Sequence, residues 1–342
     1  MMREAGYRTM KVGKTHMNNG PKADPTKHGF DHSLSFRHHS WDYFLLSDKD
    51  VAAYEEKKKG SSTKTRHSPF GPLLRDDRVK ESYENTTTTE VFGRESVRFI
   101  KQRNKKPFYL QLEFNAVHTP LTRAPKQLQK KYGIPARPFE RAAQVWDYPL
   151  WDPVAQPDYN QWYDQTCHLG VADPYGRKIY LAHLELMDKV IGDIIAAVES
   201  EGLSENTLIF FSSDNGGHRE SKANVGPNRG FKQDMYEGGI RVPMCAVWPG
   251  KITPGARSNV VALTMDLYRT VCDAAGAKAP NDIESVSILP TLLGKQQTLD
   301  RDLFWVRREG GGRYQGQDYY AVRRGDWKLL HNGPFEPLEL YN

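Results

Sequence analysis

Two short polar motifs in this sequence contain side chains that could bind a metal ion or an oxyanion. Asp214 and Asn215 offer a carboxylate and an amide oxygen side by side, just after an apolar run and before two glycines. Oxygen ligands of this kind suit a hard cation such as Ca²⁺ or Mg²⁺, although Asn-Gly is also common in ordinary turns. Lys14 and His16 are two residues apart, so on an extended segment both point to one side. That pair could hold a tetrahedral oxyanion, or it could lie in a solvated loop.

Two further residues stand in motifs that would suit a binding site. His118 lies in A-V-H-T-P, and Lys232 lies in the glycine-rich stretch R-G-F-K-Q-D-M-Y-E-G-G. A histidine at the end of a strand can be a general acid, or a core histidine whose hydrogen bonds are satisfied. Glycines let the backbone approach a ligand closely, but a lysine among them can simply be exposed. Each of these signals is weak when it is taken alone.

Hydrophobic periodicity predicts the elements that would position these residues. The predicted elements are a helix over 89–102, a strand over 107–114, a helix over 177–201, a strand over 207–213, a strand over 242–248 and a helix over 265–275. The run at 207–213 is continuously apolar, which predicts a strand buried on both faces. The alternation indicates an α/β domain with a mixed, mostly parallel central sheet flanked by helices. His118 and Asp214 then fall at the carboxyl ends of strands, where functional residues of such sheets gather.

The remaining segments are predicted to be loops and a small terminal sheet. Residues 37–80 are polar and indicate a loop or insertion, whereas 124–176 are rich in Pro, Trp and Tyr and indicate a long loop that shapes a pocket. Strand-like runs at 319–323 and 327–330 predict a small C-terminal sheet. We therefore expect a main domain over 1–300 and the start of a C-terminal subdomain over 301–342.

Composition limits the classes of partner. The net charge of +6 favours polyanions in general, but no aromatic-rich nucleic-acid motif accompanies the lysine runs at 57–59 and 101–106, which indicate solvated faces. We expect no nucleic-acid partner, and the apolar runs are too short for a membrane span. Cys167, Cys245 and Cys272 include no C-x-x-C pair and so indicate neither a disulfide framework nor a zinc site. Cys245 lies in an apolar run and is expected to fill the core.

A series of short motifs follows one order along the chain. They are G-Y-R-T with G-K-x-H (6–16), G-F-D (29–31), H-T-P at 118, M-D-K-V-I-G (187–192), S-S-D-N-G-G-H (212–218), K-x-x-x-Y-E-G-G-I-R-V-P (232–243), W-P-G (248–250) and A-V-R-R-G-D-W-K-L (321–329). This series resembles the sulfatase family over nearly the whole chain. The resemblance implies an alkaline phosphatase-like fold and the hydrolysis of sulfate esters of carbohydrates or aryl groups.

The resemblance also implies a role for each candidate residue. Asp214 and Asn215 match two ligands of a divalent cation, usually calcium with Mg²⁺ possible, which neutralises the sulfate oxygens. Lys14 and His16 match the pair near the formylglycine nucleophile and the sulfate. His118 matches the histidine near the leaving oxygen, and Lys232 matches the lysine that binds sulfate. Cleavage of a sulfate ester needs such charge neutralisation, a proton donor at the leaving oxygen and a strong nucleophile.

The sequence departs from the family pattern in two places. Thr15 stands where the family usually has Trp. The family's first strand, with paired Asp ligands, and the C/S-x-P-S-R nucleophile motif normally precede G-Y-R-T and do not occur in residues 1–342, since no cysteine here is followed by x-P-S-R. We therefore expect a fragment that is inactive by itself, in which most of the cation's ligand shell is missing.

Two alternatives to a sulfatase remain open. One is a phosphatase or phosphodiesterase of the same superfamily, and the other is a non-catalytic binder of sulfated polymers. The G-K-x-H and E-G-G-x-R-V-P motifs favour a sulfatase, with a sulfated carbohydrate or aryl sulfate as substrate. No leader peptide is recognisable in the first residues, and the resemblance suggests a periplasmic or secreted protein if a leader preceded them.

Overall fold

The computed structural model describes most of the chain and divides it into two compact units. The described residues are 1–15, 24–36, 43–45, 49, 52, 56, 73–81, 83–84, 86–102, 105–119, 121, 123–137, 154–155, 173–219, 221–308, 318–333 and 336–342. Unit 1 comprises Met1–Asp147, Ala172–Thr207 and Val271–Glu284, and unit 2 comprises Tyr148–Val171, Leu208–Thr270 and Ser285–Asn342. His16, Cys167 and the lysines at 57–59 lie outside the described residues. The domain boundary predicted at residue 300 stays a prediction.

Unit 1 contains a five-stranded mixed sheet. In spatial order its strands are β5 (Val79–Glu81), β4 (Leu73–Arg75), β2 (His32–Phe36), β1 (Arg8–Lys14) and β7 (Phe108–Glu113). β1 runs parallel to β2 and β7, whereas β4 runs antiparallel to β2 and β5. The three longest strands are therefore parallel, and the predicted mixed α/β sheet is confirmed.

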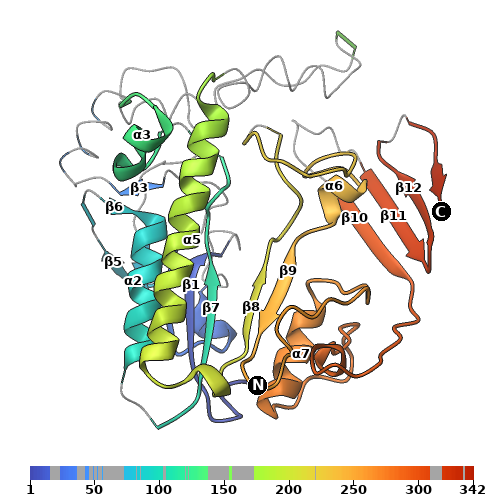
Figure 1. The fold of residues 1–342 in the computed structure, drawn as a ribbon, viewed down its shortest axis with the longest axis horizontal. Helices are drawn as coiled ribbons and strands as arrows, with labels where there is room; N and C mark the ends of the chain where they lie inside the picture. Colours follow the sequence, from blue (N-terminus) through green and yellow to red (C-terminus); the bar gives the residue numbers. More distant parts are fainter. Residues whose placement is uncertain are drawn as a thin grey trace. The chain divides into compact units, whose positions relative to one another are not determined.

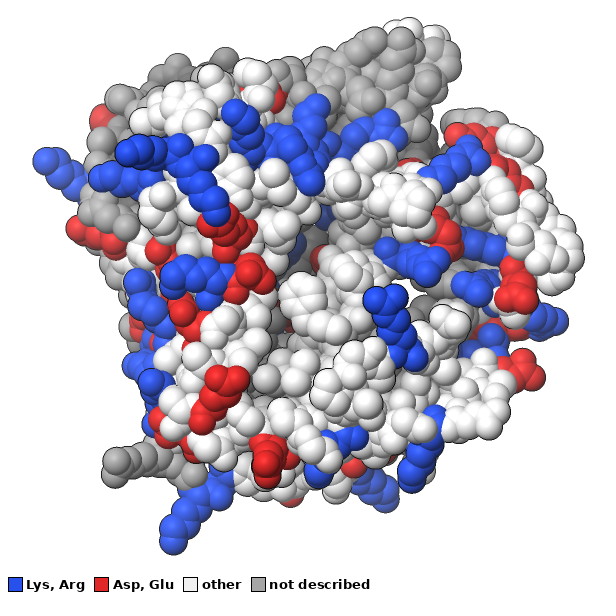
Figure 2. Space-filling model, in the orientation of Figure 1, with Lys and Arg blue, Asp and Glu red and all other residues white. Residues whose placement is uncertain are grey.

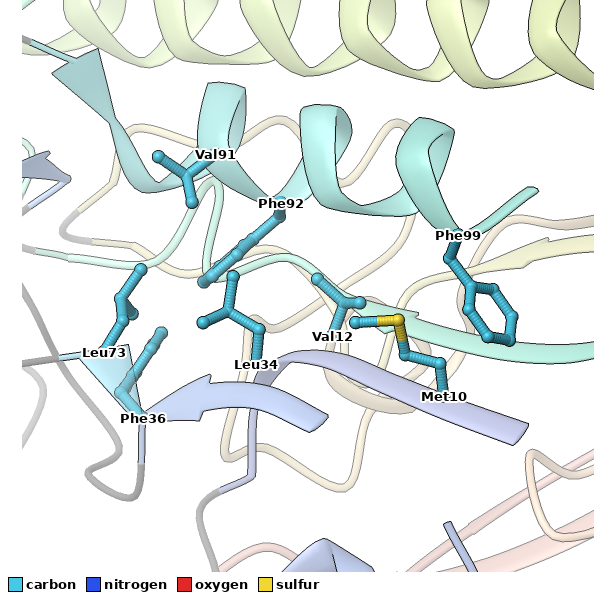
Figure 3. Packing of buried hydrophobic residues seen from close by; sticks show 8 residues of the cluster. All are labelled: Met10, Val12, Leu34, Phe36, Leu73, Val91, Phe92 and Phe99. Atoms are coloured by element: carbon cyan, nitrogen blue, oxygen red, sulfur yellow. The ribbon is translucent and has the colours of Figure 1, made fainter. Parts of the chain in front are cut away.

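Helices α2 (Thr88–Lys101) and α5 (Gly176–Ser200) lie side by side in unit 1 (Figure 1). The main apolar cluster joins the sheet to α2 (Figure 3) and consists of Met10, Val12, Leu34, Phe36, Leu73, Val91, Phe92 and Phe99. A Cβ atom at Gly93 of α2 would lie 2.3 Å from a methyl carbon of Val190, so this glycine allows α2 and α5 to pack closely. α2 begins with a capping box between Thr87 and Glu90. Both helices were predicted to within one residue at each end.

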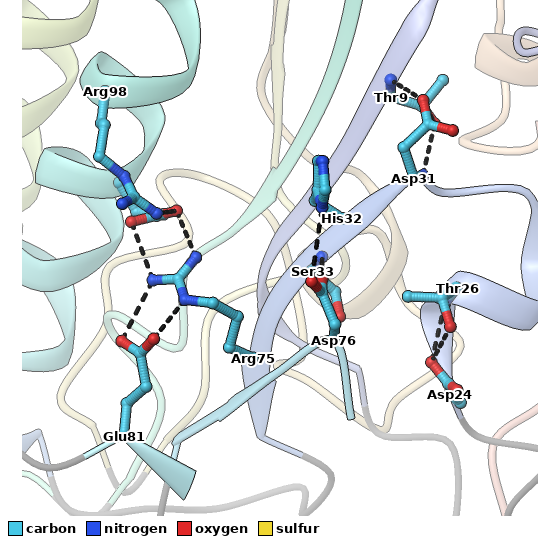
Figure 4. A network of polar contacts seen from close by, with 11 residues as sticks. Thr9, Asp24, Thr26, Asp31, His32, Ser33, Arg75, Asp76, Glu81 and Arg98 are labelled. Atoms are coloured by element: carbon cyan, nitrogen blue, oxygen red, sulfur yellow. Dashed lines mark hydrogen bonds and ion pairs between the residues drawn. The ribbon is translucent and has the colours of Figure 1, made fainter. Parts of the chain in front are cut away.

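The opposite face of the same strands is polar, because alternate side chains of a strand point to opposite sides. Thr9, Lys11, Ser33 and Ser35 are all buried there. Polar contacts hold the surrounding loops in place (Figure 4): the Asp31 carboxylate accepts a hydrogen bond from the Thr9 amide at 2.9 Å. Asp76 accepts one from the Ser33 amide at 2.7 Å. β1 and β2 therefore alternate apolar and polar side chains, and both of their faces are buried.

Two predicted loops contain regular structure. In 37–80 the described residues include β3 (Phe44–Leu45), β4 and β5, and β3 pairs with β6 (Thr86–Thr87). In 124–176 they include helix α3 (Lys126–Tyr132), where Leu128 and Tyr132 pack against a cluster that contains Ile179 of α5. The loop prediction was wrong at these places because the elements are too short to show a period. Residues 138–153 and 156–172 of the predicted pocket-shaping loop lie outside the described residues.

In unit 2, strands β8 (Ile209–Ser212) and β9 (Met244–Val247) form an antiparallel pair. The strands themselves were predicted, but burial of β8 on both faces was wrong, because Phe211 is 38% exposed. Cys245 is also exposed and does not fill a core as predicted. An apolar run shows that a strand can be buried, but its exposure depends on the elements that pack against it. Among the described strands, β9 is the one that pairs with β8.

A four-stranded antiparallel sheet forms the C-terminal part of unit 2, as predicted. Its strands in order are β10 (Leu303–Arg308), β11 (Asp318–Arg324), β12 (Trp327–His331) and β13 (Glu339–Tyr341). Tyr319, Ala321 and Leu330 on one face pack against Met235 and Tyr236. The shorter helical elements of the chain are η2 (Pro25–His28), η4 (Ser204–Asn206), α6 (Glu237–Ile240), α7 (Asp266–Ala275) and α8 (Leu289–Leu292). No helix in the described part of the chain combines the length and hydropathy needed to cross a membrane.

Candidate functional site

In unit 2 the segment after β8 and the glycine-rich segment before β9 are joined by backbone hydrogen bonds. We call residues 213–219 and 229–240 the double loop. The amide of Gly216 donates to the Gly239 carbonyl at 2.8 Å, and the amide of Lys232 donates to the Gly217 carbonyl at 2.7 Å. A Cβ atom at Gly216 would lie 1.9 Å from the Gly238 carbonyl oxygen, so the two segments can approach this closely because the position is glycine.

The double loop carries three of the predicted site residues. Asp214 is exposed, whereas Asn215 and Lys232 are half-buried. The side-chain amide of Asn215 donates to the Gly216 carbonyl at 2.9 Å, which leaves Oδ1 as the acceptor end of the side chain. The backbone hydrogen bond between Lys232 and Gly217 fixes the main chain of Lys232 next to the Asp214-Asn215 turn.

His218, which the sequence did not single out as a site residue, lies in the same double loop. Burial, and then the positive charges of Lys232 and Arg219, lower the pKa of His218 to about 3. The imidazole is therefore neutral at ordinary pH, and the positive charges that act on it are those of Lys232 and Arg219. The Arg219 guanidinium lies 4.9 Å from the centre of the Phe231 ring. The signal was present in S-S-D-N-G-G-H, but a histidine after two glycines looks like part of an ordinary turn.

In unit 1, Lys14 is the last residue of β1 and its backbone is closely fixed. The Lys11 ammonium donates to the Lys14 carbonyl at 3.0 Å and lies 2.6 Å from the Glu113 carboxylate on β7. Burial lowers the pKa of Lys11, and the charge of Glu113 opposes this shift. Gly13 has a φ of +102°, and a Cβ atom there would lie 2.0 Å from the Glu113 carbonyl oxygen. β1 and β7 therefore meet closely at the position that precedes Lys14.

His118 follows the carboxyl end of β7, the parallel neighbour of β1. The Tyr43 hydroxyl lies within hydrogen-bonding distance of the carbonyls of Asn115 and His118 and so holds the turn. Nδ1 of His118 is 2.6 Å from the Thr119 carbonyl, and because a carbonyl only accepts, Nδ1 carries a hydrogen. Nε2 is then an acceptor in the neutral ring and a proton donor in the imidazolium.

The predicted residues thus form one set in each unit. Lys14 is the last residue of β1 and His118 follows the end of β7, its parallel neighbour in unit 1, whereas Asp214, Asn215 and Lys232 share the double loop of unit 2. His16, the sixth predicted residue, lies outside the described residues.

Asp214 and Asn215 bring one carboxylate and one amide oxygen to the double loop, and their role as cation ligands stays a prediction. Within the described ranges, no group of three or more His, Cys, Asp and Glu side chains could hold a metal ion. A calcium ion takes about six to eight oxygen ligands, so these two residues do not complete its shell.

Comparison with known families places this arrangement in context. The sulfatase family model matches residues 1–277, and the model described as "N-sulphoglucosamine sulphohydrolase, C-terminal" matches residues 230–342. The first match covers well over half of the chain. The chain belongs to the sulfatase family.

Individual relatives agree with this assignment. The chain is 28% identical over 346 residues to the N-acetylgalactosamine-6-sulfatase of Canis lupus familiaris, and this alignment covers 96% of this chain and 52% of the relative. It is 31% identical over 276 residues to a sulfatase of Formosa agariphila, which covers 74% of this chain and 43% of the relative. The chain spans about half the length of the curated relatives that it matches.

Solved structures share the fold. The structure of Ps i-CgsB in complex with k-i-k-neocarrahexaose has a TM-score of 0.77 at 26% identity and covers 99% of this chain and 66% of that chain. BT4656, solved with D-glucosamine-2-N,6-O-disulfate, has a TM-score of 0.63 at 19% identity, over 100% of this chain and 74% of that chain, and shows the fold alone. The predicted alkaline phosphatase-like α/β fold is confirmed.

Proposed function

We propose that this chain carries the sulfate-recognising part of a sulfuric ester hydrolase that acts on sulfated carbohydrates or aryl sulfates. The observation that carries the proposal is the double loop, in which Asp214, Asn215 and Lys232 share one backbone framework. Relatives support it, since they include N-acetylgalactosamine-6-sulfatases and an arylsulfatase of Hemicentrotus pulcherrimus.

Each residue has a role that follows from its chemistry. Lys14 and Lys232 neutralise charge on the sulfate oxygens, and His16 assists Lys14 in holding the group. His118 binds the leaving oxygen and, as the imidazolium, donates its Nε2 proton to it, while the Thr119 carbonyl holds the Nδ1 hydrogen. Asp214 and Asn215 would hold a Ca²⁺ or Mg²⁺ ion that neutralises further sulfate oxygens, with the other ligands supplied from outside this pair.

Residues 1–342 do not contain the family's nucleophile motif, since no C/S-x-P-S-R sequence occurs in them. We therefore propose that these residues bind a sulfate ester without turning it over by the family's mechanism. A second candidate function is a non-catalytic binder of sulfated polymers, which the net charge of +6 favours because it attracts polyanions.

The test is an assay of residues 1–342 with 4-nitrophenyl sulfate and 4-nitrophenyl phosphate in the presence of Ca²⁺. We expect isothermal titration to show binding of the sulfate, with no release of 4-nitrophenol. Asp214→Ala and Lys232→Ala should weaken the binding, while Lys295→Ala, which removes an exposed charge elsewhere in unit 2, should not.

The other outcomes separate the candidate functions. Release of 4-nitrophenol from the sulfate that depends on Asp214 would show a working sulfatase and contradict the inactivity proposed for residues 1–342. Faster hydrolysis of the phosphate would favour a phosphatase of the same superfamily. Absence of binding to either compound would contradict sulfate recognition altogether.

A further inference from the structure

A second group of cations in unit 1 lies close along the chain to His118. The segment from Leu121 to Arg137 contains five Arg or Lys residues and no Asp or Glu, and the start of α5 adds Arg177 and Lys178. We call α3 with the first turn of α5 the basic surface. Figure 2 shows Lys and Arg side chains gathered in this region, over α3 and the upper end of α5 in the view of Figure 1.

Two carboxylates near this surface, those of Glu185 and Asp173, already form ion pairs. Glu185 lies 2.6 Å from the Lys131 ammonium and accepts a hydrogen bond from the Tyr132 hydroxyl at 2.7 Å. Asp173 is buried and forms an ion pair with Arg137. The acidic side chains therefore neutralise Lys131 and Arg137 and leave the positive charge of the rest of the surface in place.

Three lysines carry this remaining charge outward. Lys126, Lys130 and Lys178 are exposed, and none of them belongs to an ion pair within the described part of the chain. Lys126 and Lys130 are one helical turn apart, so their side chains point the same way. A Cβ atom added at Gly133, the residue that ends α3, would lie 3.9 Å from the Lys178 ammonium. Lys178 therefore lies beside the end of α3.

The basic surface rests on a fixed base. Leu128 and Tyr132 of α3 pack on a buried cluster that includes Ile179 and Ala182 of α5. Because this cluster is well packed, the lysine backbones keep their spacing, and only the side chains must be ordered when an anion binds.

The same frame connects the basic surface to His118. Tyr43 holds the His118 turn, and the fully buried His183 of α5 lies with Nε2 2.8 Å from the Arg123 carbonyl. Leu121 and Ala124, between these two points, are buried in the cluster under α3. The described residues between His118 and the first lysine of α3 are therefore anchored at Leu121, Arg123 and Ala124.

We propose that the basic surface binds the neighbouring sulfate or carboxylate groups of a sulfated polysaccharide whose cleaved ester lies at His118. The inference rests on the proposed function and extends it by naming a polymer as the substrate class. A small aryl sulfate has a single anionic group and offers no second one for the basic surface to bind. The net charge of the surface adds attraction at a distance, which raises the rate of encounter with a polyanion.

The surface fits a glycan better than a nucleic acid. Binding of single-stranded nucleic acid relies on aromatic side chains that stack with bases. The nearby tyrosines, Tyr132, Tyr175 and Tyr180, are packed against the cluster beneath α3 and do not form such a platform. Lysines that project from a helix can contact sulfate groups without any stacking.

The test compares binding of a carrageenan hexasaccharide and a singly sulfated disaccharide by the full chain. We expect Lys126→Gln/Lys130→Gln/Lys178→Gln to weaken hexasaccharide binding about tenfold, because three surface charge pairs that each contribute little alone are lost together. Disaccharide binding should weaken about twofold or less. The hexasaccharide loss should shrink as salt rises from 50 to about 300 mM, since exposed charges are screened. Binding is the readout, so the outcome does not depend on turnover.

The matched control removes the same number of exposed lysines at the other end of unit 1. Its substitutions are Lys101→Gln, Lys105→Gln and Lys106→Gln, which precede β7. We expect hexasaccharide binding to be unchanged in this variant, with both variants retaining the circular dichroism spectrum of the parent chain.

Three results would overturn the inference. The first is an equal loss of hexasaccharide binding in both variants, and the second is no loss in the Lys126/Lys130/Lys178 variant. The third is that a single-stranded oligonucleotide binds more tightly than the hexasaccharide and loses affinity by the same factor in this variant. Failure of sulfate recognition in the 4-nitrophenyl sulfate experiment, with hexasaccharide binding retained and dependent on α3, would instead contradict the proposed function and leave the surface as a glycan-binding site.

Discussion

His183 on α5 gives the chain a pH dependence that can be calculated from the structure. Its side chain is fully buried, Nε2 lies 2.8 Å from the Arg123 carbonyl, and burial lowers its pKa to about 4 from an ordinary value of 6.5. Because the folded state disfavours the charged ring, protonation favours unfolding. The stability due to the neutral ring is fully present above about pH 6.5 and is lost as the pH falls toward 4.

The magnitude follows from the difference between the two pKa values. One pKa unit corresponds to about 1.4 kcal/mol, so the pKa difference of His183 corresponds to a loss of about 3 kcal/mol between pH 7 and pH 4. For a domain whose total stability is about 5–15 kcal/mol, this is a large fraction.

Urea unfolding, followed by circular dichroism at pH 7 and pH 4.5, measures this effect. We compare the parent chain with His183→Gln, whose amide can still donate to the Arg123 carbonyl but does not titrate. We expect the free energy of unfolding to fall by about 2–3 kcal/mol more in the parent than in the variant over this range. His28→Gln, at an exposed position, should behave as the parent does. Equal pH dependence in the parent and His183→Gln would refute the reasoning.

Three further substitutions test separate parts of the structure. Gly238→Ala places a Cβ atom 2.0 Å from the Gly230 carbonyl oxygen, so we expect a lower melting temperature and sulfate binding weakened about tenfold; unchanged binding would show that the double loop is not required. Thr87→Ala removes the capping box of α2 and should lower the free energy of unfolding by about 1 kcal/mol in urea, whereas no change would mean that the cap is not formed. Asp266→Asn leaves the Arg301 guanidinium without its buried carboxylate partner and should cost about 3–5 kcal/mol by the same measurement, and a cost under about 1 kcal/mol would contradict the buried ion pair.

The sequence predicted the elements whose hydrophobic period is long enough to recognise. α2, β7 and α5 were predicted because their apolar positions repeat over several turns or one full strand. β1 and β2 were not, because each offers only two apolar positions in a short alternation, Met10 and Val12 in β1 and Leu34 and Phe36 in β2. α3 was missed because a helix of about two turns shows almost no period.

The candidate site was partly predictable for a different reason. Asp214, Asn215 and Lys232 were singled out by motif order, and that order does not state which segments touch. The hydrogen bonds between the two segments of the double loop, which fix Lys232 beside Gly217, depend on packing between glycines that are distant in the sequence. His218 was missed because its neutral state comes from burial and from the charges around it, which a linear motif does not express.

The central claim is that side chains of this chain recognise a sulfate group, and its most direct test is a binding comparison with a single sugar. Isothermal titration of residues 1–342 with N-acetylgalactosamine 6-sulfate and with N-acetylgalactosamine isolates the contribution of the sulfate. We predict at least about tenfold tighter binding of the sulfated sugar, which Lys232→Ala removes and Lys295→Ala retains, because a charge-assisted hydrogen bond contributes about 1.5–3 kcal/mol. Equal affinity for the two sugars, or unchanged binding in Lys232→Ala, would contradict the account.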